Sequence, residues 1–466
     1  MKKGDIVEGT VETLRFPNKG VFHTENSEIV VKNTIPGQRI RTRITKRRSG
    51  RAEGCLLEIL EPAPCEILPA CPRFGTCGGC LYLNLPENEE LALKEQQIRR
   101  LLLEADPEAD TWFEGILESP LTSEYRNKME LTFGDEVKDG PMTLGMHKRG
   151  SFYDVTNADE CRIVDADFRT MIRATREYWA AEGVPFYHRM RREGYLRHLL
   201  IRKGMETGEI LADLVTTTKR PEGEEELLNG WKECLLSQDY KGSIAGILHT
   251  HNDSMADIVE DQGTDILYGK DSFEEELLGL QFTVSPFSFF QTNSCGAELL
   301  YETARRMITE GMEAKKGEKD KKPVIFDLYC GTGTISQLIA PVASKVIGVE
   351  IVEEAVTAAR ENAVRNHTPN CEFIAGDVLK VIDTIEEKPD FIILDPPRDG
   401  VHPKAMPKIL QYGVQHILYI SCKPTSLARD LPIMREAGYV PVRGVSVNQF
   451  PKTANVETVV LLSKIQ

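Results

Sequence analysis

The sequence has no long hydrophobic run and no overall surplus of basic residues. No stretch of about 18 apolar residues occurs in its 466 residues, which argues against a membrane span. The N-terminal residues MKKGDIVEGT lack the apolar core of a signal peptide. A formal net charge of -15 argues against a protein coated in basic surface, and no internal repeat is apparent. We therefore expect a soluble, cytoplasmic, multidomain protein that does not contact membranes.

Cysteine, by contrast, is unevenly concentrated. Eleven are present, and three of them share the ten-residue stretch CPRFGTCGGC, from Cys71 to Cys80, with three glycines. Cytoplasmic thiols stay mostly reduced, so a close set indicates metal binding or catalysis rather than disulfides. Most of the other cysteines are scattered and by default fill packing positions.

The pattern along the chain predicts three domains. Residues 1–62 read as short alternating strands broken by glycine, proline and asparagine, which predicts a small β-barrel of the oligonucleotide-binding type. Residues 63–285 predict a central antiparallel α+β domain, which contains the cysteine segment and a helix at about 86–104 that is a candidate for packing on the catalytic domain. Residues 286–466 predict a Rossmann-like α/β domain, with strands at 324–328, 345–349, 372–374, 391–394 and 416–420.

Two segments are locally basic in spite of the acidic total. Arg39–Arg51 carries seven basic residues and no acid, and His188–Gly204 carries a single acid, Glu193. Each segment is a candidate surface for contacting RNA phosphates. The alternative is a solvated face on an acidic protein.

The first chemical motif is FDLYCGTGTI, in which an expected strand enters a glycine-rich turn and a helix. Gly331 and Gly333 allow a ligand to approach the backbone, but Ser336 replaces the third glycine of a dinucleotide fingerprint. Glu350 ends the next strand, where it can accept hydrogen bonds from both hydroxyls of a ribose, and Asp377 ends the one after. This set favours S-adenosylmethionine over NAD, and a dehydrogenase is the alternative.

Two further motifs follow later strands of the same expected sheet. In ILDPPRDG, two prolines remove backbone donors and project Asp395 into the cleft, as in amino-group methyltransferases that bind an extruded base. In YISCKPTSLARD, Cys422 precedes a helix that Pro424 can open. A helix N-terminus and Lys423 lower a thiol pKa, so Cys422 is predicted to be a nucleophile rather than a small buried residue.

A cysteine nucleophile near a nucleobase site suggests pyrimidine chemistry. Thiolate attack at C6 turns C5 of a pyrimidine into an enolate that can take a methyl group from a sulfonium. A base must then remove the C5 proton so that the cysteine can leave. Glu457, just before the last apolar strand, can serve as that base. A lone glutamate on a strand is otherwise a solvated side chain.

Five motifs together resemble the RNA uracil-C5 methyltransferases, and within them the iron–sulfur-containing bacterial group that acts on 23S ribosomal RNA. The motifs are FSFFQTNS, DLYCGTGT, DPPRDG, SCKPTSLARD and FPKTANVE. The resemblance covers nearly the whole chain. It implies a TRAM-like N-terminal barrel that binds RNA, with Cys422 as nucleophile and Glu457 as base. It also implies cofactor contacts from Gln291, Tyr329, Glu350 and Asp395, and a weaker candidate contact at Asp377.

The same resemblance implies that Cys71, Cys77, Cys80 and Cys161 hold a 4Fe-4S cluster. The C-x5-C-x2-C spacing differs from the C-x3-C-x2-C loop of radical enzymes. Four thiolates can also hold zinc, although zinc sites usually come as two C-x2-C pairs. Three positions depart from the family pattern: Lys423, Asn448 and Asn455 replace the usual Asn, Asp and His. None of them removes a reacting group.

The expected function is therefore methylation of a uridine C5 in structured RNA, with 23S rRNA as the substrate and a monomer as the active form. One alternative is a tRNA uracil-C5 methyltransferase. The other is an RNA-binding metalloprotein whose methyltransferase domain is an inactive scaffold.

Overall fold

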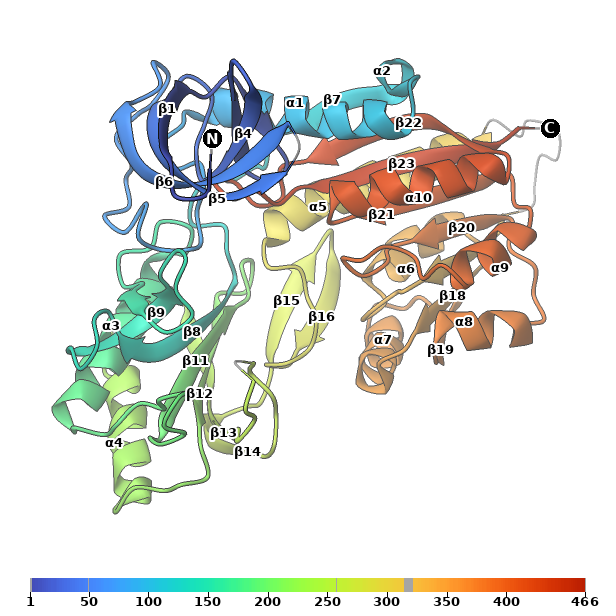
Figure 1. Cartoon of the computed structure of the whole chain (residues 1–466). Coiled ribbons are helices and arrows are strands. Elements are labelled where there is room, and N and C mark those ends of the chain that lie inside the picture. The colour runs from blue at the N-terminus through green and yellow to red at the C-terminus, as the bar shows by residue number, and fades with distance from the viewer. Residues whose placement is uncertain (1, 49, 257, 314–321, 466) are drawn as a thin grey trace.

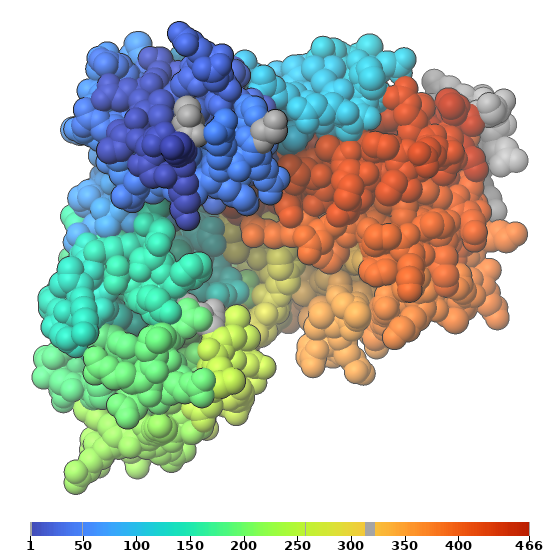
Figure 2. All heavy atoms as spheres, in the orientation of Figure 1, coloured from blue at the N-terminus to red at the C-terminus, as the bar shows by residue number. Residues whose placement is uncertain are grey.

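The computed structural model describes residues 2–48, 50–256, 258–313 and 322–465. Its strands form three large sheets and one hairpin (Figure 1). In Figure 2 the N-terminal sheet lies at the upper left, the central domain below it and the C-terminal domain to the right. None of the described helices is long and apolar enough to cross a membrane.

The N-terminal sheet has the strand order β1-β5-β6-β4-β3-β2. It curls on itself, so that β1 also contacts β3 (Figure 1). Apolar side chains, including Phe22, Ile29 and Ile40, fill its interior, because alternate residues of a strand face the same side. Its strands are β1 (Ile6–Thr10), β2 (Thr13–Arg15), β3 (Lys19–Thr24), β4 (Ser27–Lys32), β5 (Arg39–Arg48) and β6 (Arg51–Glu61).

The central domain is a seven-stranded sheet in the order β10-β9-β8-β11-β12-β13-β14. The prediction of an antiparallel sheet is wrong at one pair, since β12 and β13 are parallel. A parallel pair needs a crossover, and helix α4 (Glu224–Leu236) provides it. The other elements are β8 (Lys128–Asp135), β9 (Met142–His147), β10 (Val155–Asn157), α3 (Ala166–Ala181), β11 (Leu196–Lys203), β12 (Glu209–Thr216), β13 (Ser243–His251) and β14 (Thr264–Gly269).

The C-terminal sheet has the order β19-β18-β17-β20-β21-β23-β22-β7. All five predicted strands are present within one residue at each end: β17 (Val324–Leu328), β18 (Lys345–Glu350), β19 (Cys371–Ala375), β20 (Phe391–Leu394) and β21 (His416–Ser421). These are parallel, whereas β23 (Glu457–Lys464) runs antiparallel between β21 and β22 (Tyr439–Val447). The sheet is therefore doubly wound, with an antiparallel extension at one side.

Helices cover this sheet, and two of its elements come from early in the chain. Helix α1 (Glu87–Ala105) packs Ile98 and Leu102 into the same core as Leu427 of α10 (Pro424–Glu436), and β7 (Phe113–Leu117) pairs with β22. Residues 87–117, which the sequence placed in the central domain, thus complete the C-terminal sheet. The remaining elements are α2 (Ala109–Trp112), β15 (Phe273–Leu277), β16 (Leu280–Val284), α5 (Ser294–Glu313), α6 (Thr334–Ile339), η1 (Ala340–Val342), α7 (Glu353–Arg365), α8 (Val378–Val381), η2 (Ile382–Thr384) and α9 (Ala405–Gln411).

Candidate functional site

Cys422 directly follows the last residue of β21 and stands two residues before Pro424, with which α10 begins. Strand β23 pairs with β21 in an antiparallel register that matches Ser421 with Thr458. One residue further along this register, Cys422 lies opposite Glu457, so strand pairing brings the predicted nucleophile and base together. Asp395 follows the neighbouring strand β20, at the same edge.

The side chains of Cys422, Glu457, Asp395 and Arg398 form one electrostatic group. Burial, followed by the charges of Glu457 and Asp395, raises the pKa of Cys422 to about 11. Burial and Asp395 raise the pKa of Glu457, which is only 4% exposed, well above its usual range. The positive charge of the Arg398 guanidinium lowers the pKa values of both Cys422 and Glu457, because it stabilises the thiolate and the carboxylate. The sequence analysis did not single out Arg398.

The predicted low pKa of Cys422 is wrong for the free protein. The N-terminus of α10 is close, but two carboxylic groups and a buried setting outweigh its partial charge. Lys423 adds little, because its ammonium group lies 3.6 Å from a carboxylate oxygen of Asp399 and its side chain is 43% exposed. The thiol is therefore protonated near neutral pH until binding changes its surroundings.

This protonation predicts how Cys422 reacts with an alkylating agent. Below a thiol's pKa the thiolate fraction rises tenfold per pH unit, so alkylation should speed up about tenfold per unit from about pH 7 to about pH 9. Mass spectrometry of the Cys422 peptide after timed iodoacetamide treatment measures the rate. Exposed Cys55, treated in the same samples, is the internal reference for the reactivity of the reagent. A Cys422 rate that is flat over this interval would contradict the raised pKa.

Glu350 braces the predicted cofactor turn. Its carboxylate accepts hydrogen bonds from the backbone N–H groups of Gly331 (3.1 Å), Ile351 (2.8 Å) and Val352 (3.0 Å). Tyr329, at φ +71°, precedes Gly331 and Gly333 at φ +54° and +75°. A non-glycine residue in the left-handed region at the end of a strand is a feature of functional loops.

Apolar side chains stand exposed around this turn. Phe289, Ile351 and Val352 are 68%, 66% and 48% exposed. Apolar faces beside a carboxylate suit an adenosine, whose base needs flat apolar contacts and whose ribose offers two hydroxyl donors. The residues present therefore fit S-adenosylmethionine. Asp377, the weaker candidate contact, caps helix α8, where one oxygen of its side chain accepts from the Leu379 N–H at 3.0 Å.

Gln291 and Tyr301 connect the cofactor turn to the reacting group. The side chains of Gln291 and Tyr301 are hydrogen-bonded to each other, and the Tyr301 hydroxyl faces Asp395 and Glu457. Burial, followed by the charge of Asp395, raises the pKa of Tyr301. Tyr301 belongs to an amphipathic helix, where sequence reasoning takes an aromatic residue for core, so no local signal marked it.

Comparisons with known proteins agree with this geometry. The family model described as tRNA (Uracil-5-)-methyltransferase matches residues 247–465. An uncharacterized RNA methyltransferase of Clostridium tetani is 46% identical over 100% of this chain and 99% of its own length. One from Caldanaerobacter subterraneus is 44% identical over the full length of both chains. This chain belongs to the RNA uracil-C5 methyltransferase family. The enzyme is thus an S-adenosylmethionine-dependent RNA uracil-C5 methyltransferase.

A solved structure shares the fold of this methyltransferase over its whole length. It is the tRNA (uracil-54, C5)-methyltransferase of Pyrococcus abyssi, in complex with S-adenosyl-L-homocysteine. The TM-score is 0.75 at 24% identity, and the match covers 98% of this chain and 100% of that one. The arrangement of sheets is therefore shared although most residues differ.

The loop before Glu457 is the point where the parts of the methyltransferase meet. The backbone N–H groups of Leu81 and Tyr82 both donate to the Lys452 carbonyl, at 2.8 and 3.1 Å. The Tyr125 hydroxyl, from the central domain, donates to the Pro451 carbonyl at 2.8 Å. The cysteine segment and the central domain therefore both hold the loop that leads into the predicted base.

Helix α1 holds the same loop through buried charges. Glu90 accepts from the Lys452 N–H at 2.7 Å and lies 2.8 Å from the Lys94 ammonium. Lys94 donates to the Asn448 side-chain oxygen at 2.7 Å. Glu90, Lys94 and Lys452 are 1%, 2% and 6% exposed. Asn448, one of the departures from the family pattern, is thus a hydrogen-bond acceptor inside this network.

Removing the anion of this network should destabilise the methyltransferase. Glu90→Gln would leave the buried Lys94 ammonium without its carboxylate and Lys452 with only Glu87 at 3.4 Å, which we expect to lower the free energy of unfolding by about 3–5 kcal/mol. Urea denaturation monitored by circular dichroism measures the change. Glu95→Gln on the same helix removes a partly exposed pair with Arg99 and should change stability by less than about 1 kcal/mol. Equal effects of both substitutions would contradict a special role for the buried network.

Cys71, Cys77, Cys80 and Cys161 come together at the end of strand β9. Burial, and after it the neighbouring thiols, raise the pKa values of Cys80 and Cys161, the latter to about 11. Strand β9 supports the loop, since the Gly78 N–H donates to the His147 carbonyl at 3.0 Å. The Arg149 guanidinium donates to the Cys80 carbonyl at 2.8 Å.

The spacing of these sulfur atoms bears on which metal they fit. Tetrahedral zinc with Zn–S bonds of about 2.3 Å holds its sulfurs about 3.8 Å apart. No three of these four sulfurs lie within 4.8 Å of one another, for in the described ranges only His249, His251 and Asp265 form such a group. Four thiolates suit zinc and an iron–sulfur cluster alike, and rotation of the cysteine side chains changes these spacings. His249 is buried and hydrogen-bonded to Thr216 at 2.8 Å, as part of the central sheet.

The first basic segment presents only part of its charge to solvent. Arg39 and Arg41 both pair with Glu8, at 3.2 and 2.9 Å. Further along β5 the basic side chains are exposed: Lys46, Arg47 and Arg48. The surface that suits RNA phosphates is therefore the far end of this strand.

The prediction of phosphate contacts is wrong for the second half of the second basic segment. Arg197, Arg202 and Lys203 are buried. Arg202 donates to the carbonyls of Ser285 and Ser288, both at 2.7 Å, and so ties β11 to the loop before Gln291. Burial lowers the pKa of Arg202 to about 10. The exposed cations of the segment are Arg189, Arg191 and Arg192.

Proposed function

We propose that the enzyme methylates C5 of a uridine in 23S rRNA by covalent catalysis at Cys422. The observation that carries the proposal is the pairing of β21 with β23, which sets Cys422 opposite the buried carboxyl of Glu457 and beside Asp395. A nucleophile and a base on one side of a nucleobase site are the two groups that C5 methylation requires.

The reaction divides into three steps at these residues. Cys422 releases its proton to water, and its sulfur forms a bond to C6 of uracil while the electron pair of the C5–C6 double bond moves to C5. S-adenosylmethionine supplies the methyl group that C5 then takes. Glu457 accepts the C5 proton, the C5–C6 double bond re-forms, and the C6–S bond breaks to release Cys422. Arg398 stabilises the thiolate and the Glu457 carboxylate.

Access to this site requires an extruded base. Glu457 is 4% exposed and Cys422 is partly buried, so a uracil stacked in a helix cannot reach them. The target base therefore leaves the stack and enters the site. Asp395, with its pKa raised to about 7 by burial and by Asp327, is half-buried beside the route. A carboxyl that is partly protonated near neutral pH can donate to a uracil carbonyl as well as accept from its N–H.

S-adenosylmethionine contacts are proposed for Gln291, Tyr329, Glu350 and Asp395. Glu350 has the strongest support, because its carboxylate lies at the mouth of the glycine turn among exposed apolar side chains. Asp377 acts indirectly, by capping α8 beside the turn.

Cys71, Cys77, Cys80 and Cys161 are proposed to hold a 4Fe-4S cluster with a structural role. Three close cysteines with a distant fourth, rather than two C-x2-C pairs, support a cluster over zinc. The cysteine loop hydrogen-bonds to Lys452, so the cluster would hold the loop before Glu457 in place.

Cys77→Ala should therefore lose iron before it loses chemistry. We expect iron and acid-labile sulfide to fall by at least about half, with proteolysis of the region around residue 77 and, as a consequence, lower activity. Anaerobic purification followed by iron and sulfide analysis measures this. Cys234→Ala, a half-buried thiol of α4, is the matched control and should keep its iron. Full iron content in Cys77→Ala would remove Cys77 from the ligand set.

RNA contacts are proposed for the N-terminal sheet as a TRAM-like domain, with the exposed cations of β5 on the RNA backbone. The enzyme would act as a cytoplasmic monomer. A tRNA substrate is the alternative, and the name of the matching family model and that of the Pyrococcus abyssi enzyme favour it. An inactive scaffold is disfavoured, because both Cys422 and Glu457 are present and opposed.

Mapping of 5-methyluridine in a deletion strain tests the substrate. Loss of 5-methyluridine from 23S rRNA, restored by the wild-type gene, is the expected result. Loss of 5-methyluridine from tRNA alone would show that the substrate is tRNA and not 23S rRNA. Unchanged 5-methyluridine in both RNAs, together with no radiolabelled methyl transfer to total RNA in vitro, would overturn it.

A further inference from the structure

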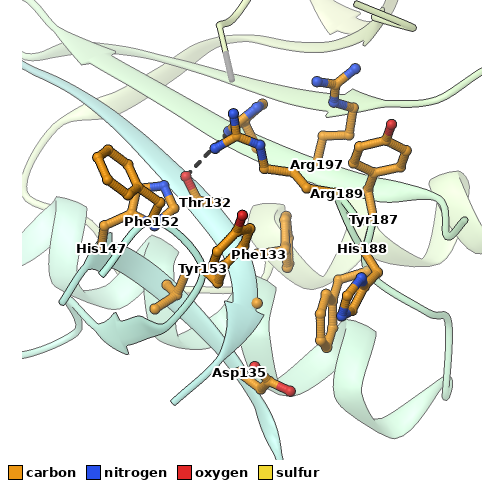
Figure 3. Close-up of a pocket in the computed structure, with 14 residues that line it drawn as sticks. Thr132, Phe133, Asp135, His147, Phe152, Tyr153, Tyr187, His188, Arg189 and Arg197 are labelled. Carbon is orange, nitrogen blue, oxygen red and sulfur yellow. Dashed lines mark hydrogen bonds between the residues drawn. The ribbon is translucent and has the colours of Figure 1, made fainter. Parts of the chain in front are cut away.

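A pocket on the central domain lies outside the site described above. Its walls are the end of β8, the turn between β9 and β10, and the segment that leads into β11 (Figure 3). Its cavity volume is about 60 Å³ and it is open to solvent, so its walls can receive the face of a flat group but do not enclose a nucleotide.

Aromatic side chains from two separate loops meet across this pocket. Phe152 and Tyr153 come from the turn before β10, and Phe186 and Tyr187 come from the segment before β11. In Figure 3, Phe152 and Tyr187 lie on opposite sides with Tyr153 between them. Phe152 is 78% exposed and Tyr153 is 58% exposed. Large aromatic side chains held together in water indicate an interaction site.

The loops hold these rings in position. The Ser151 hydroxyl oxygen accepts hydrogen bonds from the N–H groups of Tyr153 and Asp154, at 3.2 and 3.1 Å. These two hydrogen bonds hold the backbone of the turn in one conformation. On the other side the Arg197 guanidinium lies 4.7 Å from the centre of the Tyr187 ring. Arg197 is anchored by its bond to the Asn252 carbonyl at 2.6 Å. A ring that is ordered beforehand loses little entropy when a ligand stacks on it.

The rim carries positive charge next to the aromatic rings. Arg189 lines the pocket, and the exposed Arg191 and Arg192 follow in the same turn. Aromatic rings that stack on bases, together with arginines that contact phosphates, are how proteins bind unpaired RNA. His147, also in the wall, belongs to the strand end that supports the cysteine loop.

We propose that this pocket binds an unpaired nucleobase of the RNA substrate, at a position other than the target uridine. The proposal rests on the proposed function for the identity of its ligand as RNA. Stacking accounts for the aromatic rings, and the arginines contact the adjoining phosphates. Each stacked base contributes about 1–3 kcal/mol, which corresponds to at least about a fivefold change in affinity.

The test removes both exposed rings and measures RNA binding directly. The probe is a short single-stranded RNA of mixed sequence that contains 2-aminopurine, and the same sequence closed in a duplex is the comparison. The full-length enzyme should bind the single strand more tightly and quench its fluorescence. Phe152→Ala with Tyr153→Ala should weaken single-strand binding at least about fivefold, abolish the quenching, and raise KM for substrate RNA rather than lower kcat.

Two further variants make the result specific. Phe152→Tyr with Tyr153→Phe keeps both rings and should restore binding. Tyr268→Ala removes a 43% exposed aromatic side chain from β14, at the opposite edge of the same sheet, and should have no effect. If the double alanine variant bound RNA with wild-type affinity, the proposal would be overturned. The exposed rings would then be assigned to contact with a protein partner. Equal affinity for single strand and duplex would also overturn it. Failure of the proposed function would instead appear as unchanged 5-methyluridine with the ring-dependent binding intact.

Discussion

Replacing Cys422 with alanine is expected to abolish methyl transfer to RNA. In the proposed mechanism the thiol forms the bond that makes C5 nucleophilic, so kcat should fall by at least about 10⁴-fold, as when other covalent nucleophiles are removed. Transfer of radiolabelled methyl groups to RNA from a deletion strain measures the loss. RNA with 5-fluorouridine at the target should give a covalent adduct with the wild-type enzyme and none with the variant, because fluorine at C5 cannot be abstracted and the complex is trapped.

A matched cysteine substitution controls this experiment. Cys371 is a half-buried thiol on β19 of the same sheet, 3.4 Å from the Ser336 carbonyl, and Cys371→Ala should keep its adduct and its activity. An adduct formed by the Cys422→Ala enzyme would show that another group attacks the base, and the mechanism would be wrong.

Replacing Glu457 with glutamine should have the second largest effect, at a different step. The amide cannot accept the C5 proton, so the methylated base should remain attached to Cys422. We expect turnover to fall about 10²–10⁴-fold. Natural substrate RNA, without 5-fluorouridine, should accumulate as a covalent complex with the enzyme. Denaturing gel electrophoresis of enzyme with radiolabelled RNA measures the complex, and mass spectrometry confirms that it carries the methyl group.

The control for Glu457 is a glutamate of the same domain that is exposed. Glu372 on β19 has a side chain that is 56% exposed and pairs with Lys345, so Glu372→Gln should leave turnover near wild type. Release of free 5-methyluridine at the wild-type rate by Glu457→Gln would assign the base to another group. Loss of both adduct and product would mean that Glu457 acts before methyl transfer.

The strands of the C-terminal sheet were predictable because their signal is local. An apolar run bounded by a glycine or a charged residue marks a buried parallel strand, and β17 and β20 begin and end at the predicted residues. The convergence of Asp395 and Cys422 follows from this, because parallel strands place their carboxyl ends at one edge. The addition of β7 to the same sheet was not predictable, since its partner β22 lies more than 300 residues later.

The electrostatic predictions were less successful, because charge effects depend on neighbours in space. The raised pKa of Cys422 comes from burial and from carboxyls on two other strands. The buried ends of Arg197 and Arg202 satisfy carbonyls of distant loops, which a run of basic letters cannot reveal. Tyr301 was missed for the same reason.

By itself, the sequence determined the five parallel strands of the C-terminal sheet, and it predicted a candidate nucleophile, a candidate base and the close set of cysteines in Cys71–Cys80. These follow from residue type and short spacing, which the chain carries locally. Only the tertiary structure decided that Glu457 lies opposite Cys422 and that Arg398 and Tyr301 join them. It also decided that the cysteine loop and α1 hold the segment before Glu457. Pairing of distant strands and burial of charge set these relations, and both depend on the packing of the whole chain.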